Sequence, residues 1–210
     1  TKKQASPTSP VGFKSNTTPR GAVLEPLNPL LVSLGVANAS FIAQGVDWMP
    51  EQLYDIVRKA FRHRGFSFVR VIQRCPEFLP KMFEPWLHDP GRTLLLSHRH
   101  GLTLSPELSR TYKNQIEHDP SNIDRAREIA SSEDPIPVGI LYHNPDVPCY
   151  DDLHGVGGAA GADWPFDDLA VARRVLRVER RHSAAGHAFQ VALQRVLRGA
   201  DAIVHFDRGA

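Results

Sequence analysis

The sequence predicts an α/β domain with a parallel sheet, followed by an irregular region and a helical tail. Two apolar segments, 40–44 and 66–72, flank an amphipathic helix within one short stretch of chain. A strand–helix–strand unit of this kind implies parallel pairing and a right-handed crossover. Hydrophobic residues make up 41% of the 210 residues, so a sizeable core can form.

The first half of the chain carries the clearest local signals. Asn28 is a suitable cap for a helix over 30–37, with Pro29 at its first position. The next predicted helix covers 51–63 and ends before Gly65. One apolar face follows helical spacing in this segment: Leu53, Ile56, Val57, Ala60 and Phe61.

The second half is less regular. Frequent prolines predict loops over most of 76–122, interrupted by a strand at 93–97. A short helix is expected at 122–130 and a strand at 136–142.

Residues 151–210 form a separate tail in this interpretation. A glycine-rich linker at 155–161 precedes a basic helix at 167–181 and a second helix at 185–198. The basic helix could bind nucleic acid or an acidic protein, but its interleaved acids favour a solvated face. We expect the tail to fold onto the main body, residues 1–150, or onto a partner.

Composition excludes several classes of protein. The 25 Lys and Arg residues nearly balance 23 Asp and Glu residues, which argues against a nucleic-acid-coating polycation. No apolar run is long enough to predict a membrane-spanning helix. Two cysteines suggest a reducing, cytoplasmic setting. Because Thr1 is not Met and the first residues resemble mid-chain sequence, we expect a fragment or a processed product.

Three features could carry chemistry. The segment 1–26 is rich in Ser, Thr and Pro and is basic, so it is either an anion-binding loop or a solvated linker. Cys75 follows directly after a predicted parallel strand, where α/β proteins place ligands, although a buried thiol is the commoner role. His98 and His100 have no third ligand at a recognisable spacing, so a loop role is preferred to zinc binding.

A resemblance to a known family extends this interpretation. The opening T-K-K-Q-A-S-P-T-S-P-V-G-F-K-S, then S-F-I-A-Q-G, H-R-G-F-S-F-V-R-V-I-Q-R-C, H-D-P-S-N and I-P-V-G-I-L-Y occur in this order. Together they resemble the β subunit of 2-oxoacid:ferredoxin oxidoreductases over residues 1–150. The resemblance implies the C-terminal part of a thiamine diphosphate-binding domain.

That family converts a 2-oxoacid and coenzyme A into acyl-CoA, and electrons pass through a [4Fe-4S] cluster to ferredoxin. The resemblance therefore implies thiamine diphosphate, Mg²⁺ and a cluster as cofactors, and the α subunit and ferredoxin as partners. It places Thr1 beside thiamine diphosphate and Lys2 near the substrate carboxylate. Lys3 replaces a glycine that is usual in this loop. The Mg²⁺ motif and three cluster cysteines would lie upstream, so the fragment alone should be inactive.

The resemblance also assigns Cys75 as a cluster ligand and leaves Cys149 structural. The implied substrate is a 2-oxoacid, with 2-oxoglutarate favoured over pyruvate and no single residue that decides between them. The competing hypothesis is a non-catalytic interaction module that uses the basic helix at 167–181.

Overall fold

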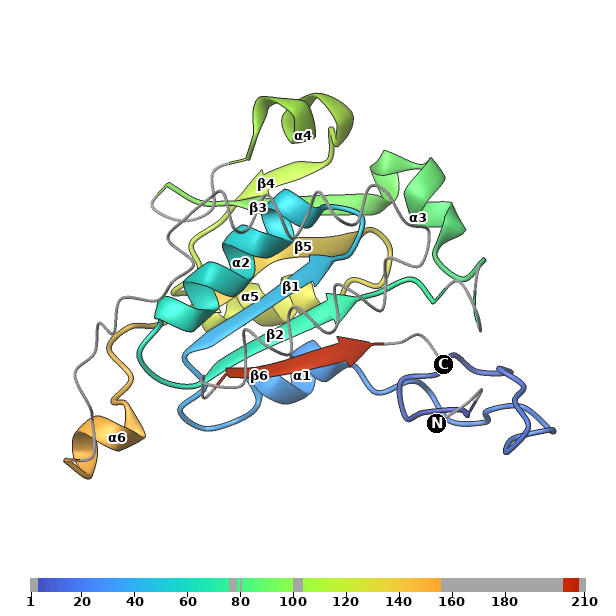
Figure 1. The fold of residues 1–210 in the computed structure, drawn as a ribbon, viewed down its shortest axis with the longest axis horizontal. Coiled ribbons are helices and arrows are strands. Elements are labelled where there is room, and N and C mark those ends of the chain that lie inside the picture. Colours follow the sequence, from blue (N-terminus) through green and yellow to red (C-terminus); the bar gives the residue numbers. More distant parts are fainter. Residues whose placement is uncertain (1–3, 76–78, 80, 100–103, 156–201, 208–210) are drawn as a thin grey trace.

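A mixed six-stranded sheet forms the centre of the computed structural model, which describes residues 4–75, 79, 81–99, 104–155 and 202–207. The strand order is β4-β3-β5-β1-β2-β6 (Figure 1). The strands are β1 (Phe41–Val46), β2 (Ser67–Ile72), β3 (Thr93–Ser97), β4 (Gln115–Glu117), β5 (Ile136–His143) and β6 (Ala202–Asp207).

The predicted α/β fold class is confirmed, but the direction of one strand pairing departs from the predicted parallel sheet. Four neighbouring pairs are parallel, whereas β1 and β5 are antiparallel. An apolar strand segment carries no signal for its direction, so the sequence pattern did not predict this reversal.

The reversal gives the sheet two chemically different ends. At the cysteine edge, Asp47, Arg74 and Cys75 follow β1 and β2, while Arg92 and Asp134 precede β3 and β5. The histidine edge is the opposite end. It carries four rings: His63 before β2, and His98, His118 and His143 at the ends of β3, β4 and β5.

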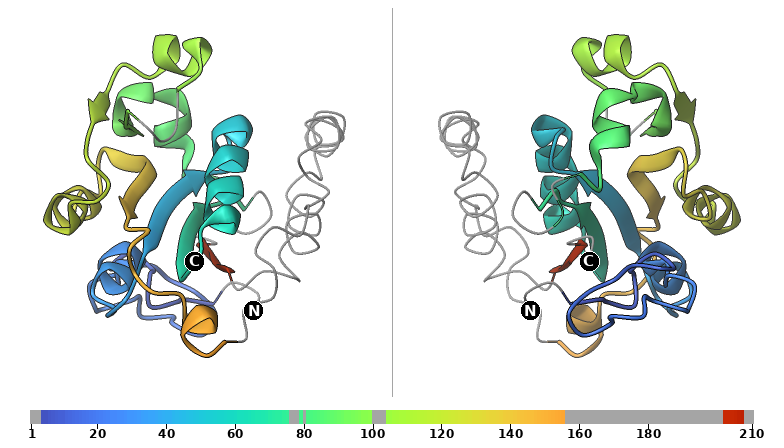
Figure 2. Two further views of the ribbon diagram at one scale, coloured as in Figure 1. Left: turned by 90° about the vertical axis from the view of Figure 1, so that its left-hand side faces the viewer. Right: turned by 90° about the vertical axis from the view of Figure 1, so that its right-hand side faces the viewer.

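Helices cover both faces of the sheet. The amphipathic helix α2 (Pro50–Arg62) packs on one face, and α1 (Pro29–Leu34) and α5 (Ile123–Ala130) pack on the other (Figure 2). All six residues of β1 are buried because the strand lies between these two layers. Alternate side chains follow the strand pleat, so Ile42 joins the α1 and α5 cluster while Phe41 and Ala43 join the α2 cluster.

The predicted elements of the first half are confirmed with small shifts at their ends. Asn28 caps α1 by accepting hydrogen bonds from the backbone N–H groups of Leu30 and Leu31. The helix ends at Leu34 rather than at residue 37. Helix α2 ends at Arg62, and Gly65 follows with a φ of +127°.

The region 76–122 is more regular than predicted. It contains α3 (Glu84–His88), a 3₁₀ turn at Pro90–Arg92, α4 (Pro106–Thr111) and β4 in addition to β3. Each of the three helical pieces has a proline in its first two positions. Proline is compatible with a helix start, so these prolines begin short helices instead of preventing them.

Part of the predicted tail joins the main sheet. Strand β6 was not predicted, and it pairs in parallel with β2 from Ser67↔Ala202 to Ile72↔Asp207. The pairing fits the expectation that the tail folds onto the main body, while the division at residue 150 stays a prediction.

The rest of the tail is described only at its start. The short helix α6 (Tyr150–Leu153) precedes the predicted linker at 155–161, of which only Gly155 is described. The predicted helices at 167–181 and 185–198 lie outside the described residues. Across the part of the chain that the structure describes, no helix has the length and apolar character needed to span a membrane.

Candidate functional site

The cysteine edge begins where β1 and β2 finish together. Their register ends at Val46↔Ile72, and the backbone N–H of Asp47 donates to the Ile72 carbonyl at 3.0 Å. The chain then reaches Cys75, a half-buried free thiol. The carbonyl of Cys75 accepts a hydrogen bond from the Leu79 N–H at 3.0 Å. Cys75 therefore lies at the carboxyl end of a parallel strand, as the sequence predicted.

An ion pair that the sequence analysis did not identify adjoins Cys75. The Arg74 Nε donates to Asp47 Oδ1 at 2.9 Å, and the Arg74 backbone N–H donates to Asp47 Oδ2 at 3.2 Å. Only 15% of the Asp47 side chain is exposed, compared with 44% for Arg74. Burial raises the pKa of Asp47, and Arg74 partly offsets this by lowering it. One carboxylate thus holds both the side chain and the backbone of the residue before Cys75.

A buried amide lies at the start of α2, which follows Asp47 at the same edge. Gln52 is 5% exposed, and neither its Oε1 nor its Nε2 has a hydrogen-bond partner among the described residues. A buried amide without partners is costly, so such groups usually pair with something that covers them. Gln52 is therefore a buried polar side chain whose hydrogen-bond partner is not among the described residues.

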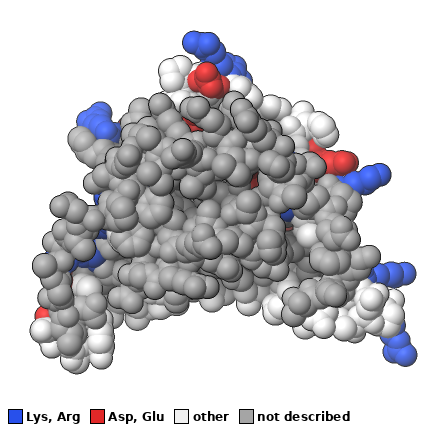
Figure 3. Space-filling view, in the orientation of Figure 1, with Lys and Arg blue, Asp and Glu red and all other residues white. Residues whose placement is uncertain are grey.

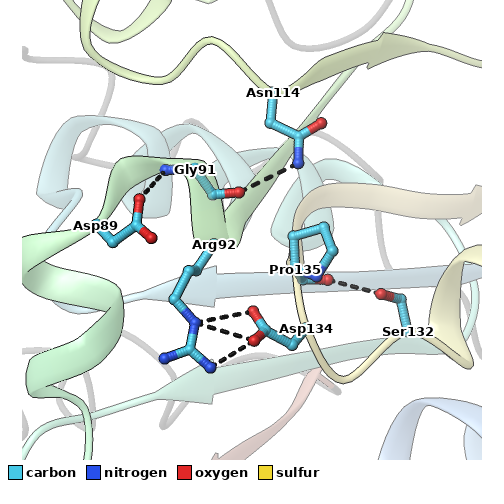
Figure 4. Close-up of polar contacts among 7 residues, drawn as sticks. All are labelled: Asp89, Gly91, Arg92, Asn114, Ser132, Asp134 and Pro135. Carbon is cyan, nitrogen blue, oxygen red and sulfur yellow. Dashed lines mark hydrogen bonds and ion pairs between the residues drawn. The ribbon is translucent and has the colours of Figure 1, made fainter.

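Polar contacts fix the loops that lead into β3 and β5 (Figure 4). Arg92 forms a forked pair with Asp134, its Nε lying 2.9 Å from Oδ2 and 3.1 Å from Oδ1. Asp89 accepts from the Gly91 N–H at 2.9 Å, and Asn114 Nδ2 donates to the Gly91 carbonyl at 3.3 Å. These contacts link the loops before β3, β4 and β5 on the cysteine edge.

The described residues contain only part of a metal site. They include no group of three or more His, Cys, Asp or Glu side chains arranged to hold a metal ion. Cys149 is also a free thiol, and it precedes α6, apart from β2 in the chain. A thiolate is the ligand that iron–sulfur clusters use, so Cys75 fits one corner of a cluster. Any other ligands would come from outside the described residues.

Thr1 and Lys2, the predicted cofactor and substrate residues, lie outside the described residues. The basic segment that follows them is folded back on itself. The Gly12 N–H donates to the Ala22 carbonyl at 2.7 Å, and the Leu27 N–H donates to the Pro7 carbonyl at 2.8 Å. Figure 3 shows Lys and Arg side chains projecting from the corner of the molecule where this segment lies.

The histidine edge was not identified from the sequence. His143 Nε2 lies 3.2 Å from His63 Nδ1, and His63 Nε2 lies 2.8 Å from Ser40 Oγ. Because Ser40 Oγ donates to the Phe66 carbonyl at 3.0 Å, it accepts from His63 Nε2–H, and His143 donates to His63 Nδ1. The missed signal was positional, since His98, His118 and His143 each lie at or just after the end of a strand.

Burial keeps these rings neutral. Desolvation, together with the nearby His143, lowers the pKa of His63 to about 4. Desolvation and the neighbouring His118 ring lower the pKa of His98 to about 4. The pKa values of His118 and His143 are also lowered, mainly by burial. His98 lies in the loop after β3 as predicted, but its ring is half-buried.

Comparisons with known proteins agree with the resemblance seen in the sequence. Residues 108–157 match the family model that describes the C-terminal part of the beta chain of pyruvate ferredoxin oxidoreductase. The 2-oxoacid:ferredoxin oxidoreductase 2, subunit beta, of Aeropyrum pernix is 30% identical over 144 residues, which are 69% of this chain and 44% of that protein. The 2-oxoglutarate oxidoreductase subunit KorB of Mycobacterium tuberculosis is 36% identical over 48% of this chain and 27% of its own length.

A solved structure extends the likeness to the fold. It is the 2-oxoglutarate:ferredoxin oxidoreductase from Magnetococcus marinus, with a TM-score of 0.55 and 25% identity over 81% of this chain and 52% of that one. The chain is a relative of the β subunits of 2-oxoacid:ferredoxin oxidoreductases. It spans about half or less of the length of these relatives. The cysteine edge and the histidine edge are therefore two ends of a fold that resembles part of the M. marinus structure.

Proposed function

We propose that this chain is part of a thiamine diphosphate-dependent 2-oxoacid:ferredoxin oxidoreductase, and that Cys75 binds its [4Fe-4S] cluster. The observation that carries the proposal is the half-buried free thiol at the carboxyl end of β2. This position matches the thiol chemistry of a cluster ligand, and the relatives are named as subunits of such enzymes.

In this proposal the cofactors supply decarboxylation and one-electron transfer, and the protein supplies position and charge. Cys75 contributes one thiolate. Thr1 contacts thiamine diphosphate, with its Mg²⁺ held outside the described residues, and the Lys2 ammonium binds the substrate carboxylate.

The proposed substrate is 2-oxoglutarate, which is converted with coenzyme A to an acyl-CoA and CO₂ while two electrons pass to ferredoxin. Support comes from the relatives, because subunit KorB of M. tuberculosis is named a 2-oxoglutarate oxidoreductase subunit. The M. marinus structure contains 2-oxoglutarate, coenzyme A and succinyl-CoA. Initial rates of ferredoxin reduction with 2-oxoglutarate and with pyruvate test this choice, and a preference for pyruvate would contradict it.

The cluster assignment is tested in the full-length complex purified without oxygen. Cys75→Ser should lower the iron content and abolish 2-oxoacid-dependent reduction of ferredoxin. Cys149→Ser is the matched control, because it replaces the other free, half-buried cysteine and should preserve both. Retention of all the iron and of the activity in Cys75→Ser would overturn the proposal.

The proposed partner surface is the apolar patch of residues 11–36, which we assign to contact with the α subunit. Most of the exposed large hydrophobic side chains of the described residues lie here, and Val23 and Leu24 are 82% and 78% exposed. The relatives are named as subunits of enzymes, so another subunit is the expected partner for such a patch.

Co-purification of the α subunit tests this surface. Leu24→Asp should weaken the complex without lowering the melting temperature of the isolated chain, because the side chain has few intramolecular contacts to lose. Leu153→Asp is the control, since Leu153 is 71% exposed on α6, outside the patch. Equal effects of the two variants on assembly would contradict the assignment.

A further inference from the structure

We propose that Asp47 and Arg74 are positioning residues that fix the Cys75 thiol and balance the charge beside it. This inference rests on the proposed role of Cys75. Neither residue is predicted to bind a cofactor, yet both meet where β1 and β2 end.

The first argument is geometric. Asp47 contacts the end of β2 through three hydrogen bonds: its N–H to Ile72, and its carboxylate to the Arg74 N–H and Nε. On the other side, the Leu79 N–H donates to the Cys75 carbonyl. The backbone that carries the thiol is therefore held immediately before and after Cys75. Removing an outer-shell group that orients a metal ligand typically changes metal affinity about 10-fold or more. Asp47 would act through the backbone of the residue before the ligand.

The second argument concerns the cost of burying a carboxylate. The Asp47 side chain is mostly buried, and burial raises its pKa because it disfavours the ionised carboxylate. An apolar side chain could fill the same space without this cost. Only a hydrogen-bonding acceptor can hold both the backbone and the side chain of Arg74 at once. The pair is thus better explained by the fixed conformation that it imposes than by stability.

The third argument is electrostatic and gives the diagnostic measurement. Arg74 adjoins Cys75 in the chain, and Asp47 neutralises it. Asp47→Asn would leave an uncompensated cation near the thiolate, which favours the more negative, reduced cluster and raises its reduction potential. Arg74→Gln would leave the carboxylate and lower the potential. A purely structural role would not produce shifts of opposite sign.

The experiment uses the full-length complex with its cluster assembled. Asp47→Asn and Arg74→Gln should each lose iron to a chelator about 10-fold faster than wild type, and their potentials should shift in opposite directions. Arg74→Lys keeps the charge, so it should restore the potential but only part of the iron retention. Asp124→Asn is the control, because it breaks a similar but exposed ion pair, with Arg127, on α5.

Two results would overturn the inference. One is wild-type iron loss and potential in both variants. The other is a shift of the same sign in both, which indicates general loosening. Because Arg74 is exposed, Arg74→Gln keeps the test valid if Asp47→Asn does not fold. Cys75→Ser separates the two proposals. If Cys75→Ser loses iron while Asp47→Asn and Arg74→Gln behave like wild type, only the positioning role is rejected. Retention of the cluster in Cys75→Ser rejects both.

Discussion

The two ends of the sheet treat charge in opposite ways. At the histidine edge, four titratable rings form two contacting pairs, His63 with His143 and His98 with His118, and burial lowers the pKa of each ring. At the cysteine edge, an ionised pair adjoins a free thiol. The first end excludes charge and contributes to packing, whereas the second maintains charge beside a potential ligand. We therefore expect function to be concentrated at the cysteine edge, and the predictions below test this division.

The largest expected effect is on stability at the histidine edge. Phe41 is 1% exposed, and its ring lies 5.6 Å from the His63 ring and 5.5 Å from the His143 ring. Phe41→Ala should lower the free energy of unfolding by about 3–5 kcal/mol, because it leaves a cavity between α2 and the sheet. Urea denaturation measures this change. Val32→Ala on the exposed face of α1 is the control, and an equal loss there would show that Phe41 has no special packing role.

The next effect is a dependence of stability on pH. His63 and His98 have folded-state pKa values of about 4, below the ordinary value of 6.5. A lowered folded pKa means that the full stabilisation is present above pH 6.5 and is lost as the pH falls toward 4. The free energy of unfolding should therefore decrease over this interval as the unfolded state takes up protons. Asp47 has the opposite sign, because its raised pKa favours the folded state at low pH.

Replacing one ring tests this mechanism. The slope of unfolding free energy against pH reports how many protons are taken up on unfolding. His63→Gln should reduce this number by up to about one between pH 6.5 and pH 4. His88→Gln is the control, because His88 is exposed on α3. If His63→Gln leaves the slope unchanged, the neutral histidine cluster does not contribute to the pH dependence.

The fold could be predicted from the sequence further than the site. Helix α2 and its flanking strands were predictable because Leu53, Ile56 and Ala60 repeat at helical spacing between two apolar runs. The position of Cys75 after a parallel strand was predictable from the apolar run that precedes it, whereas its role as a ligand stays a prediction. The Asp47–Arg74 pair was not predictable, since its members are 27 positions apart and meet only through the β1–β2 register. The histidine edge likewise forms because β5 runs antiparallel to β1, which brings the end of β5 beside the start of β1. No local sequence pattern specifies this direction.

The smallest expected effect on stability is at the residue with the largest proposed role. Cys75→Ser should change the free energy of unfolding of the iron-free protein by less than about 0.5 kcal/mol. The hydrogen bond from the Leu79 N–H is accepted by the backbone carbonyl of Cys75, and serine retains this carbonyl. The Cys75 side chain is only half-buried, so replacing its sulfur with oxygen changes little packing. Urea denaturation of the iron-free variant, run beside Phe41→Ala, measures the contrast directly. A loss as large as that of Phe41→Ala would make Cys75 a packing residue, and the functional distinction between the two edges would no longer hold.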